Sequence, residues 1–317
     1  MPAITATAPG KIILFGEHCV VYGRPAIAAP VDQVRARAVV SAAPRRSSGS
    51  VLVQAPDLGL ESYLDELPED HPLAQAIRLT IREAGVPYSP ACTIRVSSTI
   101  PIAAGLGSGA AVSVAIGRAL SAFLGNPLPD AAISNLAYEV DKLHHGTPSG
   151  IDNTTIAFRY PIYFERNQGP KILDLPKPFT IVIGDTGIPS PTAVAVGDLR
   201  RQWQADPRRC ETLFDAAGAL AREARLAIES GTPERLGSLM NQNHALLVEM
   251  GVSSSELDRL VEAARAAGAQ GAKLSGGGRG GNMIALVDGE MSALVSQALI
   301  RSGAARTITT TIHRPWK

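Results

Sequence analysis

The chain has 317 residues, 45% of them hydrophobic and 19% charged, and its 30 Lys and Arg residues nearly balance 29 Asp and Glu residues. A formal net charge of +1 argues against a protein that binds nucleic acid or a membrane surface, because both need concentrated basic residues. A chain of this length usually divides into two domains, and a small-molecule partner fits its composition best.

The cysteines and the apolar segments favour a cytoplasmic protein. Cys19, Cys92 and Cys210 are too few and too widely spaced for a disulfide framework or a zinc site. No basic segment followed by an apolar run opens the sequence, and no apolar stretch reaches the ~20 residues needed to cross a bilayer. We therefore expect a reducing, cytoplasmic location, with no membrane and no nucleic acid as partner.

The first strongly patterned region reads as a strand, a glycine loop and a helix. Residues 92–97 alternate apolar and polar side chains, as a half-buried strand does. The loop "AAGLGSG" (103–109) follows. From Ser108 apolar residues recur every three to four positions, which predicts a helix that ends near Gly125.

A second helix is expected to begin at the N-cap Asp130. It leads into "HHGTPSGIDNTT" (144–155), where we expect Asp152 to be held on a stiff, glycine-flanked turn. Beyond it, "FTIVIGDTGIPSPT" (179–192) reads as a buried strand that leaves through a proline-containing turn. Further helices are expected near 211–230, 233–249, 255–267 and 290–301, and a final strand at 306–313.

Gly105, Gly107 and Gly109 stand immediately before the first helix. Glycine lets backbone N–H groups approach an anion, and a helix N-terminus adds partial positive charge, so this loop is suited to bind phosphate. A simple tight turn explains the pattern equally well, and the loop matches neither a Walker loop nor a dinucleotide fingerprint. Ser108 would either cap the helix, which is the commoner role, or bind magnesium.

A second loop, "KLSGGGRGGNMIAL", contains the glycine segment, residues 276–281, in which five of six residues are glycine. So many glycines carry a large entropic cost on folding, so we expect something to lie very close to this backbone. Apolar residues on both sides argue against a flexible linker. An apolar, strand-like run follows where a dinucleotide fingerprint needs a helix.

Four motifs, in order, resemble those of the small-metabolite kinases that include galactokinase, homoserine kinase, mevalonate kinase and phosphomevalonate kinase: "PGKIILFGEHCVVYG", "PIAAGLGSGAA", "HGTPSGIDN" and "KLSGGGRGG". They span residues 9–281, and "GEHCVVYG" with "HGTPSGIDN" is most similar to the mevalonate branch. The resemblance implies a two-domain α+β fold. Residues 1–188 would form a ribosomal-protein-S5-like α/β domain with the ATP loop and catalytic Asp, and residues 189–317 a ferredoxin-like α/β domain with the glycine segment.

The resemblance also implies catalytic and metal-binding residues. Asp152 matches the catalytic aspartate, and Lys11 matches the lysine that stabilises its ionised carboxylate and the developing alkoxide. Ser108 matches a magnesium-ligating serine. The second ligand is usually a glutamate four residues before the histidine of "HG", where this chain has Asp141, one methylene shorter, so that ligation through a water is an option. Glu139 is the alternative, because it lies nearer the apolar face of the helix.

The matching binding positions form two groups. Glu17 and His18 match residues that contact the acceptor, and Thr192 matches a threonine near the reacting phosphate. Gly276 and Gly277 are expected to line the acceptor site. The ATP phosphates would lie along the first loop, at Pro101, Ala104, Gly105, Leu106, Gly107, Ser108, Gly109 and Ala110.

The glycine segment departs from the family pattern at two positions. Gly277 replaces an alanine, and Arg279 replaces a glycine. The arginine would either change contacts with a substrate or an inhibitor, or bring a guanidinium group to the phosphates.

The implied reaction is the transfer of a phosphoryl group from ATP, with Mg²⁺, to the 5-hydroxyl of (R)-mevalonate, which gives 5-phosphomevalonate and ADP in isoprenoid biosynthesis. Phosphoryl transfer needs alignment and cations more than a strong base, so Asp152 is expected to act mainly by positioning and electrostatics. A related kinase acting on phosphomevalonate or a sugar is one alternative, and a non-catalytic metabolite sensor is another. Lys11, Ser108 and Asp152 together argue against a sensor, and we also expect a homodimer.

Overall fold

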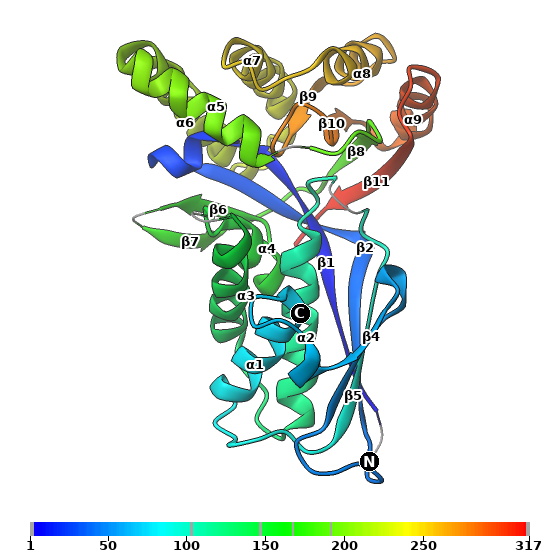
Figure 1. The fold of residues 1–317 in the computed structure, drawn as a ribbon. Coiled ribbons are helices and arrows are strands. Elements are labelled where there is room, and N and C mark those ends of the chain that lie inside the picture. The colour runs from blue at the N-terminus through cyan, green and yellow to red at the C-terminus, as the bar shows by residue number, and fades with distance from the viewer. Residues whose placement is uncertain (1–2, 102–103, 146–147, 167, 191, 315–317) are drawn as a thin grey trace. The chain divides into compact units, whose positions relative to one another are not determined.

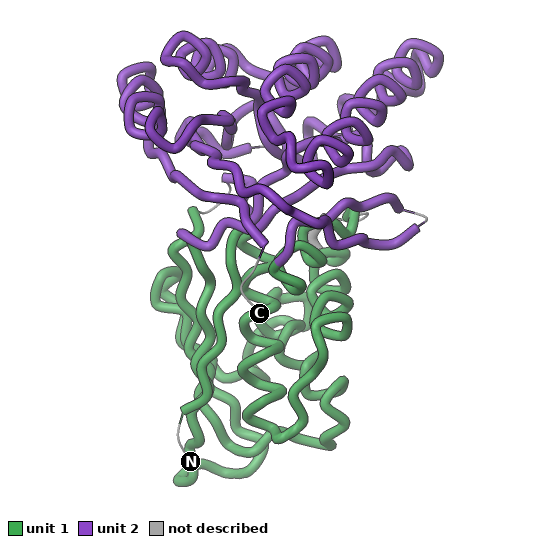
Figure 2. Tube along the Cα trace, turned by 180° about the vertical axis from the view of Figure 1, so that it is seen from behind, with its two compact units in different colours: residues 1–10, 34–101, 107–159 green, residues 11–33, 102–106, 160–317 purple. Residues whose placement is uncertain are grey.

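The computed structural model describes residues 3–101, 104–145, 148–166, 168–190 and 192–314 (Figure 1). The chain forms two compact units, each made of several segments (Figure 2). Unit 1 comprises residues 1–10, 34–101 and 107–159, and unit 2 comprises residues 11–33, 102–106 and 160–317. The sequence analysis divided the chain into two continuous domains after residue 188. Each compact unit instead combines separate segments of the chain that contact one another, so the two divisions describe different things and the predicted one stays a prediction.

Unit 1 consists of a twisted sheet and a layer of helices beside it (Figure 1). The sheet order is β4-β3-β5-β2, in which β3 and β5 are parallel and the other neighbours antiparallel. The long strands β1 and β2 contribute residues to both units. The elements are β1 (Ile4–Phe15), β2 (Ala26–Ala42), β3 (Val51–Ala55), η2 (Pro56–Leu58), β4 (Leu60–Tyr63), η3 (Leu64–Glu66), α1 (Pro72–Glu83), β5 (Cys92–Ser98), α2 (Ser108–Phe123), α3 (Asp130–His145) and α4 (Ile151–Phe158).

Unit 2 contains a four-stranded antiparallel sheet of order β11-β8-β10-β9. A pair of short strands, β6 and β7, continues from the first residues of β2. The elements are η1 (Cys19–Tyr22), β6 (Ile162–Glu165), β7 (Gly169–Ile172), β8 (Phe179–Asp185), α5 (Thr192–Ala205), α6 (Pro207–Glu229), η4 (Pro233–Arg235), α7 (Leu236–Glu249), α8 (Ser255–Ala266), β9 (Gly271–Ser275), β10 (Asn282–Val287), η5 (Gly289–Met291), α9 (Ser292–Arg301) and β11 (Arg306–Ile312).

The order of elements in unit 2 confirms the predicted ferredoxin-like architecture. The chain runs from β8 through helices to the hairpin β9–β10, and then through α9 to β11. Numbered from β8, the strands lie in the order 4-1-3-2, which is that of a βαββαβ unit. Its first strand, β8, ends at Asp185 and so precedes residue 189, where the sequence analysis began this domain.

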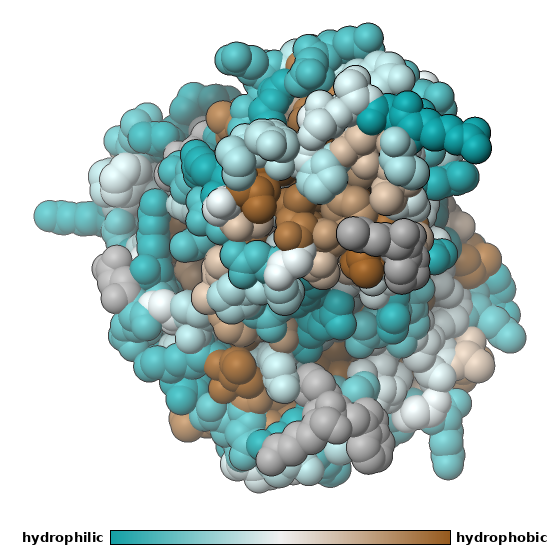
Figure 3. All heavy atoms as spheres, turned by 90° about the horizontal axis from the view of Figure 1, so that it is seen from below, coloured by the Kyte–Doolittle hydropathy of each residue, from teal (hydrophilic) through white to brown (hydrophobic). Residues whose placement is uncertain are grey.

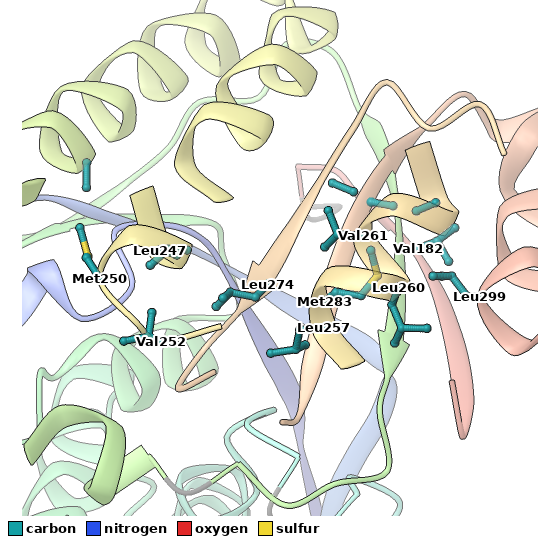
Figure 4. Close-up of a cluster of buried hydrophobic side chains, with 14 of the residues drawn as sticks. Val182, Leu247, Met250, Val252, Leu257, Leu260, Val261, Leu274, Met283 and Leu299 are labelled. Carbon is teal, nitrogen blue, oxygen red and sulfur yellow. The ribbon is translucent and has the colours of Figure 1, made fainter. Parts of the chain in front are cut away.

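A hydrophobic cluster holds the β9–β10 hairpin in place (Figure 4). Leu274 of β9 and Met283 of β10 are fully buried with Val182 of β8, under Leu257 and neighbouring residues of α8. Burying one such side chain stabilises a fold by about 1.5–3 kcal/mol. The glycine segment connects these two strands, so its ends are fixed by the core of unit 2.

Three helices differ from the sequence analysis, and one of them is α1, for which no helix was expected. Residues 192–205 form α5, where we expected only the end of a turn, because Ala195 and Leu199 alone are buried and give little apolar periodicity. Asp152 lies in the first turn of α4 and not on a turn, because the chain begins a short helix directly after Gly150, which has a φ of 88°. The other expected helices and strands are confirmed within a few residues.

The face shown in Figure 3 is mainly hydrophilic, and its hydrophobic residues form several separate groups. Within the described residues, every helix is too short or too polar to qualify as a bilayer-spanning segment.

Candidate active site

The first glycine loop passes directly into α2. Gly105 and Gly107 have φ values of 81° and 75°, which glycine adopts without the cost that a side chain imposes. Gly107 is the N-cap of α2 and Ser108 is the first helical residue, without a side-chain cap in this helix. The capping role considered for Ser108 is therefore wrong, and the N-terminus of α2 is formed by backbone N–H groups, which suit an anion.

Asp141 lies beside the start of α2. A methyl group at Gly109 would be 3.9 Å from Oδ1 of Asp141, so the last part of α3 is close to the first turn of α2. Glu139 has a different environment: Nζ of Lys142 lies 3.1 Å from both of its carboxylate oxygens, and its side chain is 51% exposed. Of the two proposed ligands, Asp141 has the position that suits a metal bound with Ser108.

Asp152 is held by the packing of α4 on α3. Nδ2 of the neighbouring Asn153 donates to the carbonyl oxygen of Ser134 at 3.0 Å and to its Oγ at 2.9 Å. Asp141 lies beside the first turn of α2, whereas Asp152 lies in the first turn of α4, whose next residue, Asn153, bonds to Ser134 in the first half of α3. The expected grouping of Asp152 with Ser108 stays a prediction. Gly146 and Thr147 of the same motif lie outside the described residues, as do the side chains of the two histidines before them.

In unit 2, Lys11 is tied to the first glycine loop. Lys11 lies on β1 with only 4% of its surface exposed, and its backbone N–H donates to the carbonyl oxygen of Leu106 at 3.0 Å. The side chain of Asn282 donates to the carbonyl oxygen of Ala104. Residues 104–106 therefore connect β1 with the end of the glycine segment. The predicted pairing of Lys11 with Asp152 stays a prediction.

The close neighbour of the glycine segment is the protein itself. A side chain at Gly278 would overlap the carbonyl oxygen of Val252, and one at Gly277 would overlap Oγ1 of Thr192. Oγ of Ser190 donates to the carbonyl oxygen of Gly278 at 2.9 Å. The segment is thus packed against the start of α5, with Thr192 directly beside Gly277. The predicted role of these two residues in binding the acceptor stays a prediction.

His18 is buried in a left-handed backbone conformation, with a φ of 58°. Its Nε2 lies 3.1 Å from the carbonyl oxygen of Gly277, and because a carbonyl only accepts, Nε2 carries the hydrogen. Burial lowers the pKa of His18 to about 4. The ring is therefore neutral near pH 7 and its Nδ1 is an acceptor, which is buried and has no hydrogen-bond partner among the described residues.

Glu17 pairs with a lysine that the sequence analysis missed. Nζ of Lys273 donates to Oε1 of Glu17, and both side chains are fully buried. Nζ also donates to the carbonyl oxygen of Leu274 at 2.7 Å. Burial raises the pKa of Glu17 and lowers the pKa of Lys273, because each charge loses water. The predicted direct contact of Glu17 with the acceptor stays a prediction.

Arg279 links the glycine segment to α5 and to the end of α7. Its guanidinium group pairs with Asp198 and donates to the carbonyl oxygen of Gly251 from Nε at 3.3 Å and from Nη2 at 3.1 Å. The residue is also in a left-handed conformation, with a φ of 55°. The ion pair and the two hydrogen bonds explain the position of the guanidinium group by contacts within unit 2. A contact with phosphates is not needed to explain this position.

Comparison with known proteins identifies the class. Residues 71–159 match the model of the GHMP kinases N terminal domain, and residues 224–304 match that of the GHMP kinases C terminal domain. The chain belongs to the GHMP kinase family, whose members use ATP.

Within this family the similarity is to mevalonate kinases. The chain is 36% identical to the mevalonate kinase of Pyrococcus abyssi, over 95% of this chain and 93% of that protein. It is also similar to the crystal structure of L. major mevalonate kinase in complex with R-mevalonate, with a TM-score of 0.82 and 30% identity over 97% of this chain and 95% of that one. For the Methanococcus jannaschii mevalonate kinase structure the TM-score is 0.85, at 27% identity over 99% of both chains.

Replacing Arg279 tests its backbone conformation. Arg279→Gly and Arg279→Ala lose the same ion pair, but only glycine adopts a φ of 55° without strain. We expect Arg279→Gly to be the more stable by about 1 kcal/mol in urea unfolding. The same two substitutions at Arg201, on the exposed side of α5, should show the opposite order, because glycine destabilises a helix relative to alanine. Equal stability of the two Arg279 variants would contradict the strained conformation.

The neutral state of buried His18 predicts a dependence of stability on pH. Its pKa is about 4 in the folded chain and ~6.5 when unfolded. Below pH ~6.5 the unfolded chain binds a proton that the folded chain does not, so stability falls as the pH falls, by about 3 kcal/mol down to pH ~4.

His18→Gln keeps a donor toward Gly277 and lacks this titration. Between pH 7 and 4, its unfolding free energy should decrease by about 3 kcal/mol less than that of the wild type, measured by urea unfolding. His313→Gln, at an exposed position, serves as control. Parallel curves for wild type and His18→Gln would contradict the buried neutral ring.

Proposed function

We propose that the chain transfers a phosphoryl group from ATP to the 5-hydroxyl of (R)-mevalonate, which gives 5-phosphomevalonate and ADP. The observation that carries this proposal is the closeness of Asp141 to the first turn of α2, which begins at Ser108, and the support beside it is Asp152 in the first turn of α4. These residues supply an anion-binding helix start, an oxygen ligand for a hard cation and a carboxylate for the acceptor hydroxyl. The choice of mevalonate is supported by the full-length similarity to mevalonate kinases.

The phosphates of ATP would lie on the loop of residues 104–110 and on the N-terminus of α2, where backbone N–H groups and the helix dipole attract anions. Ser108 and Asp141 would hold Mg²⁺, with waters and phosphate oxygens as the remaining ligands. Within the described residues no group of three or more His, Cys, Asp or Glu side chains is arranged around a metal. In the proposal the magnesium ion would bind with the nucleotide and neutralise charge on its phosphates.

Asp152 would orient the acceptor hydroxyl toward the γ-phosphorus. The hydroxyl oxygen forms a bond to phosphorus, the bond from phosphorus to the bridging oxygen of ADP breaks, and the hydroxyl proton passes to Asp152. A carboxylate is a weak base for an alcohol, so the proton moves late, when the bond to ADP is largely broken. Lys11 would stabilise the carboxylate and the developing alkoxide, as the family resemblance implies.

The acceptor would be recognised by the Gly16–Glu17–His18 turn and by the region where Gly277 and Thr192 meet. Because Nδ1 of neutral His18 is an acceptor, it suits a hydroxyl group of the substrate and not its carboxylate. The proposals of a cytoplasmic location and of a homodimer rest on the sequence analysis.

An acceptor panel tests the proposed activity. We expect ADP release with (R)-mevalonate and little with phosphomevalonate or galactose. Asp152→Asn should lower kcat by at least ~100-fold with little change in ATP binding, the effect of losing a positioned proton acceptor. Robust turnover of another acceptor and none of mevalonate would refute the substrate, and near-wild-type turnover by Asp152→Asn would remove this residue from the mechanism.

Comparison of two carboxylates tests the magnesium site. Asp141→Ala should raise the Mg²⁺ concentration needed for half-maximal rate by ~10-fold or more, as expected when a metal ligand is lost. Glu139→Ala should leave it nearly unchanged, because this side chain pairs with Lys142 at the surface. Small, equal effects in a magnesium titration would mean that neither residue is a ligand.

A further inference from the structure

Three contacts join β9 and the glycine segment to residues near the start of the chain, all within unit 2. Oγ of Ser275 accepts from the backbone N–H of Ile13 at 3.0 Å and donates to its carbonyl oxygen at 2.8 Å. Lys273 pairs with Glu17, and the carbonyl oxygen of Gly277 accepts from His18. Residues 273, 275 and 277 therefore hold the end of β1 and the turn that follows it.

The Lys273–Glu17 pair is not explained by stability alone. Both side chains are withdrawn completely from water, and a buried ion pair is often replaceable by apolar residues without loss of stability. Oε2 of Glu17 is buried and has no hydrogen-bond partner among the described residues. If one partner were removed, the other would be a buried charge without a counter-ion, which is strongly destabilising. Each side chain is therefore held at the position where it contacts the other.

The residue next to Glu17 is the one with a strained backbone. A histidine with a φ of 58° is costly and persists only where its surroundings hold it. The ring of His18 is held by its hydrogen bond to the carbonyl oxygen of Gly277. The backbone of His18 is held through the preceding residue, Glu17, because the carboxylate of Glu17 is fixed by Lys273. The conformation leaves Nδ1 of His18 without a partner among the described residues.

We propose that Lys273 is a positioning residue: through its pair with Glu17 it holds the Gly16–His18 turn so that Nδ1 of His18 can accept a hydrogen bond from a hydroxyl group of the acceptor. This inference rests on the proposed function and adds to it the residue that orders the acceptor side of the site. Lys273 itself touches neither substrate in this proposal.

The kinetic test is a double-mutant cycle between Lys273→Met and His18→Gln. Lys273→Met should raise the KM for the acceptor by roughly 10- to 100-fold, the effect of about one lost hydrogen bond to it, with little change in the KM for ATP. In the His18→Gln background the same substitution should have little further effect, since it acts through His18. Additive effects, or a loss confined to kcat, would overturn the proposal.

A second variant separates positioning from stability. Lys273→Met with Glu17→Gln removes both buried charges, so this double variant should be more stable than Lys273→Met. Its acceptor KM should nevertheless stay high, because the turn is no longer fixed. Recovery of KM together with stability would mean a purely structural role. Lys177→Met, which breaks the exposed pair with Glu234, is the matched control and should change neither quantity.

A spectroscopic readout tests, without substrate, whether Lys273 positions His18. In ¹⁵N-histidine-labelled wild-type protein, the Nε2 proton of His18 should exchange slowly, because it is buried and bonded to Gly277, and His18→Gln identifies its signal. The signal should be lost in both Lys273 variants and kept in Lys177→Met. Its persistence in both Lys273 variants would overturn the positioning role. Absence of activity on mevalonate would refute only the proposed function, since this signal requires no turnover.

Discussion

The closeness of the glycine segment to its neighbours is the constraint on which the arrangement of His18 and Thr192 in unit 2 depends. Side chains at Gly277, Gly278 or Gly280 would overlap or crowd neighbouring atoms, which belong to Ile188, Pro189, Ser190, Thr192 and Val252. The same backbone supplies the carbonyl oxygen that His18 binds. A segment that was one methyl group thicker would therefore displace Thr192 and His18 together, and its high glycine content is explained by this packing before any ligand is considered.

The sequence predicted some of the regular elements whose side chains follow one period, whereas α1 and β2, which are also periodic, were not predicted. The strand Cys92–Ser98 was predicted because apolar and polar residues alternate along it. The helix from Ser108 was predicted because its apolar residues recur every three to four positions. The helix at 192–205 was missed, because only two of its residues are buried. Its packing on the glycine segment depends on contacts between distant parts of the chain, which no local pattern contains.

The same limit applies to the site. The motifs located Ser108 and Asp152, whose neighbours in sequence are distinctive, but Lys273 was overlooked because a lysine in a strand is ordinarily solvent-exposed. Only its partner, Glu17, explains its burial, and the two are separated by 256 positions. One local signal was present: Lys273 stands between Ala272 and Leu274, directly before the glycine segment. The structure shows that every residue of the strand Gly271–Ser275 is buried.

The polar groups singled out in the two units are of different kinds. In unit 1, Asp141 and Asp152 are acidic and lie near the positive ends of α2 and α4, an arrangement that suits a cation and phosphates. In unit 2, burial keeps His18 neutral, and Glu17 and Lys273 cancel each other. Under the proposed function, a substrate without a hydroxyl group at this position would leave Nδ1 of His18 buried and unpaired, which would cost free energy. In that proposal the choice of substrate would depend on a turn that carries no net charge, and phosphoryl transfer would depend on Asp141 and Asp152.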